Sequence, residues 1–231
     1  MSIKLKALGL GLLAALAVSA VTVMNASAES QATGHFTCEV EPCTVKGSEV
    51  LGSSHRFELA IAGLTGIVCD EASYKGTAAT KTVTDITITP TYGECHTTGT
   101  GTGSKSGEVT VDVNGCTYTF TQPNKESAKT EHTVDLVCPT GKTIIVTHPE
   151  CETTFDPING LKGVGYTTIL ENNIHTITLT SNVSGFSATF HKGVCVLLGT
   201  SHVGELSGAA TVRGFDSLNN PAGITATGSV N

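Results

Sequence analysis

The chain has 231 residues, of which 14% are charged, and its 20 acidic residues outnumber its 13 basic ones to give a formal charge of −7. Nucleic-acid binding depends on a high density of Lys and Arg, so this acidic composition argues against a nucleic-acid partner. The 26 glycines and the small number of strong helix formers favour many short strands joined by turns.

Residues 1–28 have the three parts of a secretory signal peptide. Two lysines precede an apolar run over residues 7–23, and Ala26 and Ala28 place small residues where a signal peptidase reads them. A membrane anchor is disfavoured because the run is barely long enough to span a bilayer and has no basic flank after it. We expect cleavage before Glu29 and a protein that is secreted or held at the cell envelope, without a membrane span in its mature chain.

Three segments alternate with a period of two residues, which places aliphatic side chains on one face and Thr, Asp or His on the other. They are residues 82–89, 108–113 and 173–180. The number and spacing of the expected strands predict an all-β fold of one or two antiparallel β-sandwiches. The shorter strands are expected, in chain order, at residues 56–61, 66–69, 116–121, 133–138, 143–147, 164–169, 186–190, 209–215 and 224–227.

The sandwich region is expected to span residues 55–231, with residues 29–54 as an N-terminal extension. Within this region residues 113–120 and 183–190 resemble each other at an offset of 70 residues. A duplicated β-unit explains the match, but strands that end in turns also resemble one another through composition alone. Both interpretations stay open, as does the choice between one domain and two related halves, residues 55–137 and 138–231.

All eight cysteines follow the signal peptide, and an even number of cysteines in an exported chain predicts disulfides. Residues 117–121 and 133–137 alternate as the two strands of a hairpin. That hairpin brings Cys116 and Cys138 side by side at its open end, so this pair is our first choice of disulfide.

The other six cysteines are harder to pair. Cys38 and Cys43 enclose four residues and can close a small local loop. Strand geometry does not determine the pairing of the remaining four. We assign Cys69 to Cys95 and Cys151 to Cys195 without a geometric argument. A metal site would need short Cys or His pairs that together make a four-ligand set, and the spacings do not provide one.

The sequence contains no motif that predicts a catalytic, cofactor or metal site. Residues 99–106 resemble a phosphate-binding loop, but Ser104 stands where the motif requires Gly before its Lys. Residues 199–204 miss the nucleophile elbow of hydrolases by one position, and the elbow needs a strand-to-helix turn. We therefore expect no cofactor, and the balance is against an enzyme.

These observations favour a non-catalytic structural or interaction module whose ligand the sequence does not name, with a protein or a cell-envelope component as the expected partner. Two alternatives stay open. A secreted hydrolase with loop-borne catalytic residues would gather groups of perturbed pKa in a cleft. A module that binds a small ligand or a carbohydrate would have an aromatic-lined or apolar pocket.

A set of residues along the mature chain carries a further resemblance: His55, Phe57, residues 66–69, Ala72, Tyr74, Gly76, residues 88–90, Tyr92, Cys95, residues 115–118, residues 137–138 and residues 208–215. In these positions the chain resembles a group of exported, cysteine-containing bacterial β proteins of unknown function. The resemblance implies export and a β fold, and it brings no activity, cofactor or site residues. Residues 216–227 are in addition similar to bacterial immunoglobulin-like repeats of the invasin type.

Overall fold

A computed structural model describes residues 34–49, 57–61, 66–98, 105–121, 132–149, 151–193 and 200–227. The predicted signal peptide lies outside these residues. All regular secondary structure in the described part of the chain is β-strand, and all strand pairs are antiparallel. The predicted all-β antiparallel fold is therefore confirmed. No helix in these ranges is long and apolar enough to cross a membrane.

The strands are β1 (His35–Cys38), β2 (Cys43–Glu49), β3 (Phe57–Ile61), β4 (Ile67–Ala78), β5 (Thr82–Val83), β6 (Asp85–Thr98), β7 (Lys105–Asp112), β8 (Thr117–Thr121), β9 (His132–Val137), β10 (Ile144–His148), β11 (Cys151–Phe155), β12 (Ile158–Glu171), β13 (Ile174–Gly193), β14 (Thr200–Phe215), β15 (Pro221–Ala222) and β16 (Ile224–Thr227). They belong to one compact unit, Ala32–Asn231.

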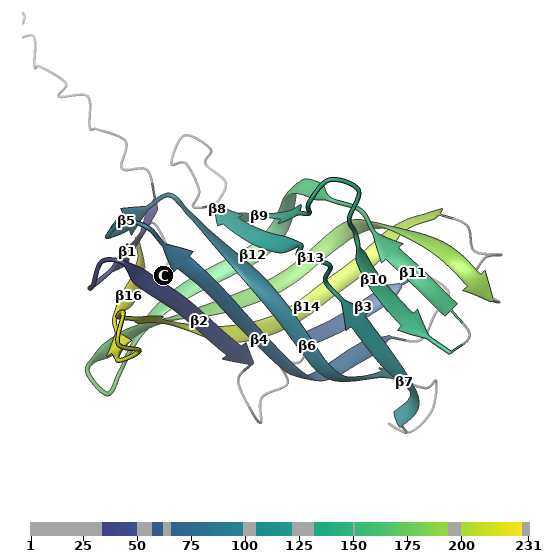
Figure 1. The fold of residues 1–231 in the computed structure, drawn as a ribbon, viewed down its shortest axis with the longest axis horizontal. Helices are drawn as coiled ribbons and strands as arrows, with labels where there is room; N and C mark the ends of the chain where they lie inside the picture. The colour runs from purple at the N-terminus through teal and green to yellow at the C-terminus, as the bar shows by residue number, and fades with distance from the viewer. Residues whose placement is uncertain are drawn as a thin grey trace, which may run out of the picture. The chain divides into compact units, whose positions relative to one another are not determined.

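The larger sheet follows the order β11-β10-β7-β6-β8-β9-β12-β13-β14-β2-β4-β3, and β15 pairs with β14. Further pairings of β4 with β6, of β11 with β13 and of β3 with β14 make the sheet return on itself. Two layers therefore face each other across the core, as in the predicted sandwich, and strands shared between them join the layers. In Figure 1, β2, β4 and β6 lie side by side in front of β12, β13 and β14.

Alternating side chains fill the space between the layers. In β6, Ile86 and Ile88 are buried, whereas Thr87 and Thr89 face solvent. An aromatic column runs through the core, in which four ring pairs have centroids 5.4 to 6.5 Å apart and Tyr92 is joined to Tyr118 through their hydroxyl groups. Burying side chains of this size contributes on the order of 2 kcal/mol each, so the interior is where most of the folding free energy arises. The column consists of Tyr74, Tyr92, Tyr118, Phe120, Tyr166 and Phe36.

The expected N-terminal extension is part of the fold. Its described residues form β1, in a small sheet ordered β16-β1-β5, and β2, which pairs with β14 and β4 in the larger sheet. Phe36 of β1 is 2% exposed and its ring packs edge-on against Tyr166 at 5.4 Å. The β2 segment alternates Cys43, Val45 and Gly47 toward the core, and the glycine in this apolar series weakens the strand pattern in the sequence.

Three disulfides join described cysteines, namely Cys38–Cys43, Cys69–Cys95 and Cys116–Cys138, with Cα–Cα distances of 6.3, 3.8 and 4.0 Å. These are the pairings expected for those six residues. Cys151 is a disulfide cysteine as well, but its expected partner Cys195 lies outside the described residues, so that pairing stays a prediction. Structural disulfides of this number are typical of proteins that fold in an oxidising compartment.

Candidate functional site

An open groove of about 610 Å³ lies over the outer face of β2 and β14. A groove of this volume falls within the range of small-molecule binding sites, roughly 300–1,000 Å³. Its lining mixes charged, hydroxyl and aromatic side chains. The groove is lined by Lys46 and Ser48 of β2, by Thr211, Arg213 and Phe215 of β14, by the Gly47 backbone and by Glu171 at the end of β12.

Three basic residues on three neighbouring strands form one row, of which Lys46 and Arg213 line the groove and Lys75 lies on the adjacent strand. Lys46 is directly opposite Arg213 on one side and directly opposite Lys75 of β4 on the other. Directly opposite residues project from the same face of a sheet, and the adjacent Val45 and Val212 are buried, so all three basic residues face outward. Strands are about 4.8 Å apart, so this cation row extends over roughly 10 Å.

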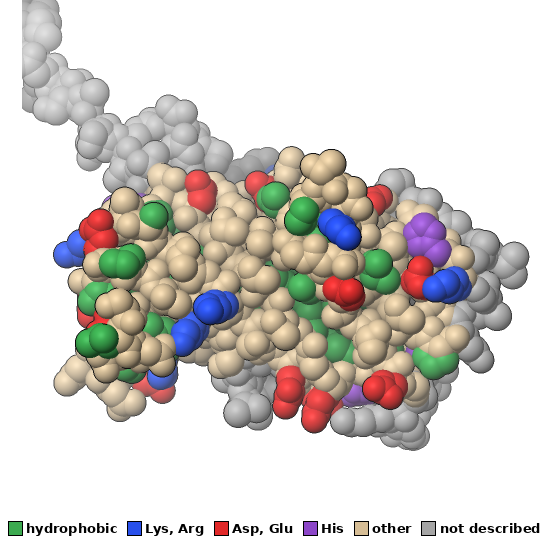
Figure 2. All heavy atoms as spheres, viewed as in Figure 1, with side chains coloured by type: hydrophobic (Ala, Val, Ile, Leu, Met, Phe, Trp, Pro, Cys, Tyr) green, Lys and Arg blue, Asp and Glu red, His purple; other side chains and the backbone are tan. Residues whose placement is uncertain are grey.

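Figure 2 shows Lys and Arg side chains gathered over β2 and β4. Like charges directly opposite each other destabilise an antiparallel pair, and the chain as a whole is acidic. The cation row therefore concentrates positive charge at a place where cross-strand repulsion opposes it.

Two of the three cations are held in place by neighbours. The Lys46 ammonium lies 4.8 Å from the centroid of the Phe215 ring, a cation–π contact, and it donates a hydrogen bond to the Asn219 side-chain oxygen. Arg213 forms an ion pair with Glu171. Lys75 is exposed, and within the described ranges no acidic side chain pairs with it or with Lys46. The row thus keeps two cations available to a ligand.

The turn after β14 fixes the position of Asn219. The Asp216 carboxylate accepts hydrogen bonds from the backbone N–H groups of Leu218 and Asn220 and from the Asn220 side chain. These bonds, first of all those from Asn220, lower the pKa of Asp216 below its usual value. Asn219 adopts a φ of 67°, a left-handed conformation that Asn tolerates in turns. The side-chain contact to Lys46 is therefore made by an ordered turn.

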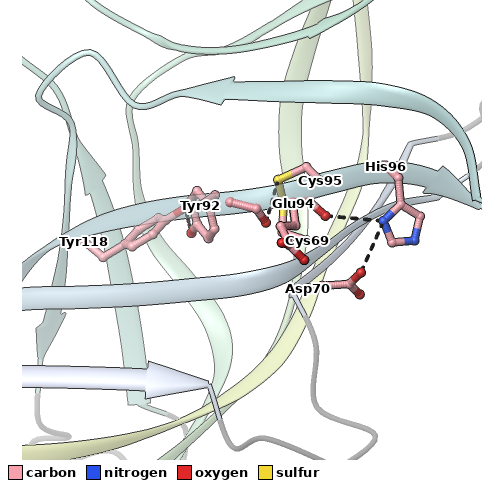
Figure 3. The surroundings of a disulfide bond; sticks show 8 residues. Cys69, Asp70, Tyr92, Glu94, Cys95, His96 and Tyr118 are labelled. Carbon is pink, nitrogen blue, oxygen red and sulfur yellow. Dashed lines mark hydrogen bonds and ion pairs between the residues drawn. A yellow bond between two sulfur atoms is a disulfide. The ribbon is translucent and has the colours of Figure 1, made fainter.

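The surroundings of the Cys69–Cys95 disulfide contain a second polar cluster (Figure 3). The His96 Nδ1 atom lies 3.7 Å from the Asp70 carboxylate and 3.4 Å from the Glu94 carbonyl oxygen. Cys69 is directly opposite Cys95, so the disulfide and the His96–Asp70 pair both link β4 to β6. Within the described part of the chain, no three His, Cys, Asp or Glu side chains are arranged to hold a metal ion. The role of the His96–Asp70 cluster is therefore to link two neighbouring strands.

The interior contains an apolar cavity of about 40 Å³ beside the aromatic column. This volume is far below that of a site for an organic ligand. Two of its polar groups bond to each other, since the Tyr92 hydroxyl donates to the Tyr118 hydroxyl at 3.1 Å. Burial raises the pKa of Tyr118 to about 12 and raises the pKa of Tyr166 as well. The interior serves packing, and the outer groove is the better candidate for binding.

The described cysteines, which were the candidate site residues of the sequence, do not line the groove. The three described disulfides stabilise the β1–β2, β4–β6 and β8–β9 connections. Residues 99–104 of the loop that resembles a phosphate-binding motif lie outside the described residues, as does residue 199 of the segment that resembles a nucleophile elbow. Sequence reasoning missed Lys46, Lys75 and Arg213, because only the strand register brings them together.

Comparison with family models, with curated proteins and with solved structures gave no match for this chain.

Proposed function

We propose that the protein is an exported, non-catalytic interaction module and that the groove over β2 and β14 binds an anionic partner in the extracellular space or the cell envelope. Export is supported by the signal-peptide pattern of residues 1–28 and by the disulfides. A binding role is supported by an open groove of adequate volume, whereas the interior cavity is small.

The single observation that carries the proposal is the cation row. Lys75, Lys46 and Arg213 are directly opposite one another in an acidic chain, an arrangement that costs stability. Local features that reduce stability without a structural benefit are expected at functional sites. An anionic ligand would bridge these cations and remove their mutual repulsion, which gives the arrangement a physical reason.

Binding to immobilised anionic polymers tests the proposal. The panel consists of polygalacturonate, polyphosphate and polyglutamate, with dextran as a neutral reference. We expect the mature protein to bind at least one of the anionic polymers, with an affinity that falls as salt is added because the charges are exposed. Dextran should not bind.

The matched variants are Lys75→Glu and Lys142→Glu, which change the net charge equally. Lys142 is exposed in the turn between β9 and β10, away from the groove. Lys75→Glu should weaken binding about tenfold, because it removes one contact and adds a repelling carboxylate. Equal effects of the two variants, or no binding to any anionic polymer, would overturn the proposal.

A further inference from the structure

We infer that the ligand of this groove is a carboxylated polysaccharide, a polymer of uronic acid units laid across the strands. The inference rests on the proposed function and adds the chemical class of the ligand. It comes from the residues that flank the cation row, which are hydroxyl side chains in a second register-matched row.

Six hydroxyl residues on six consecutive strands are directly opposite one another along the outer face of the sheet. The register pairs Thr167 with Thr178, Thr178 with Thr211, Thr211 with Ser48, Ser48 with Ser73, and Ser73 with Thr91. Each of these side chains is exposed or partly exposed. This hydroxyl row consists of Thr167, Thr178, Thr211, Ser48, Ser73 and Thr91, from β12, β13, β14, β2, β4 and β6 respectively.

The hydroxyl row runs beside the cation row. Ser48 is two residues from Lys46 along β2, and Thr211 is two residues from Arg213 along β14, so the two rows lie roughly 7 Å apart. Ser48 and Thr211 line the same groove as Lys46 and Arg213. A chain lying across the strands therefore meets cations on one side and hydroxyl donors and acceptors on the other.

A polyuronate presents complementary groups. Its carboxylates pair with Lys and Arg through charge-assisted hydrogen bonds, and its hydroxyls exchange hydrogen bonds with Ser and Thr, which both donate and accept. The Phe215 ring adds an apolar surface at one end of the row. Charge and hydroxyl rows side by side thus match a polymer that carries both groups on every unit.

A nucleic acid fits the same surface less well. Duplex DNA carries one negative charge per about 1.7 Å, so it needs a long basic surface. Here the cation row spans three strands and ends at Glu171, and the rest of the chain is acidic. A polyanion with one carboxylate per sugar unit can place a few charges on the row and continue over neutral hydroxyls.

The test compares polygalacturonate with its fully methyl-esterified form, which keeps the sugar backbone and loses the charges, and with polyphosphate and polyglutamate, which keep charges and lack sugars. We expect polygalacturonate to bind at least tenfold more tightly than the other three. Lys75→Glu should weaken its binding about tenfold, and Lys142→Glu should leave it unchanged.

The hydroxyl row is tested by the triple variant Ser48→Ala, Ser73→Ala, Thr211→Val. It should weaken binding to polygalacturonate at least fivefold and leave any residual binding to polyphosphate unchanged. The variant Ser48→Thr, Ser73→Thr, Thr211→Ser keeps every hydroxyl and should retain binding, which controls for altered packing. Far-ultraviolet circular dichroism of each variant confirms that the fold is kept.

The outcomes separate the two proposals. Equal or tighter binding of polyphosphate or polyglutamate, or a triple variant that binds polygalacturonate normally, overturns the polyuronate assignment and leaves an anion-binding groove. Failure of every anionic polymer to bind overturns both.

Discussion

Lys46 of β2 lies directly opposite Lys75 of β4, so two like charges project side by side from neighbouring strands. The next residue along the same line is Arg213 of β14 on one side and Thr89 of β6 on the other. Lys46 is tied to Phe215 and Asn219, and Arg213 to Glu171, whereas Lys75 is the exposed member of the row. Lys75 should therefore lower the stability of the fold while it strengthens the binding of an anion.

We predict that Lys75→Thr stabilises the protein while it weakens anion binding. The substitution removes a like-charge pair and places Thr opposite Thr89, a favourable cross-strand pair, so the free energy of unfolding should rise by about 0.5 kcal/mol. Urea unfolding measures the change, with Lys142→Thr as the control. A lower unfolding midpoint for Lys75→Thr would show that Lys75 contributes to the fold.

The stability of the protein should decrease in alkaline solution because of its buried tyrosines. Burial raises the pKa of Tyr118 to about 12, whereas an unfolded Tyr ionises near pH 10. A group whose folded pKa is raised contributes stability below its unfolded pKa, and this contribution is lost as the pH rises from 10 toward 12. Tyr118→Phe should flatten that loss, and it should cost about 1 kcal/mol at neutral pH because Tyr92 loses its acceptor. Titration by absorbance at 295 nm checks that the pKa of Tyr118 is raised. Ionisation of all tyrosines near pH 10 in the folded protein would contradict this prediction.

The hairpin of β8 and β9 is the part of the fold that the sequence predicts best. Its two strands were expected at residues 117–121 and 133–137, and the register pairs Thr117 with Val137 and Thr121 with Thr133. Buried Tyr118 and Phe120 alternate with hydroxyl residues, so the period of two is unbroken and leaves one register that buries the aromatic rings.

Longer strands were predicted only in pieces. Residues 173–180 and 186–190 were expected as two strands, but residues 174–180 and 186–190 both belong to β13, which runs without interruption from Ile174 to Gly193. The alternation breaks at Gly185, which has a φ of 95°, and the pairing with β14 shifts register between Ser184 and Phe186. A β-bulge of this kind changes which residues face the core, so a search for period two stops at it.

The candidate site could not be predicted for a related reason. Lys46, Lys75 and Arg213 come from three segments, and each looks like an ordinary solvated residue of its own strand. Only the pairing of β2 with both β14 and β4 makes them neighbours, and that pairing is set by the closure of the sheet. The sequence records the residue types, whereas the function proposed for them depends on register.

The contacts of Glu39 with His175 and Gly223, which we call the Glu39 clamp, should weaken in acid. The Glu39 carboxylate lies 3.2 Å from the His175 Nδ1 atom and accepts a hydrogen bond from the Gly223 N–H at 3.0 Å. The pKa of Glu39 is lowered, first by the hydrogen bond with His175 and then by that from Gly223. A lowered folded pKa contributes stability above the unfolded value of about 4.5, and that contribution is lost as the pH falls below it.

We therefore predict that Glu39→Gln lowers the thermal midpoint slightly at pH 7 and that this difference shrinks as the pH falls below about 4.5. The effect should be small because the Glu39 side chain is 52% exposed and solvent screens its interactions. The matched control is Glu41→Gln in the same loop. Equal midpoints for Glu39→Gln and the unmodified protein at pH 7 would show that the clamp contributes nothing.

The disulfides should differ in their contribution according to the length of chain that each one closes. Cys116 and Cys138 are separated by 22 residues and Cys38 and Cys43 by 5. In the chain-entropy description, removing the first link costs about 3 kcal/mol and removing the second about 2 kcal/mol, because a longer loop restricts the unfolded chain more. The double variant Cys116→Ala, Cys138→Ala should therefore lose more free energy of unfolding than the double variant Cys38→Ala, Cys43→Ala. Urea unfolding measures both losses, and both variants should keep the fold. A single replacement leaves its partner cysteine with a free thiol, which forms dimers or exchanges with other disulfides. A peptide map of the unmodified protein checks the pairing itself. A link from Cys116 to a residue other than Cys138 would refute the hairpin register.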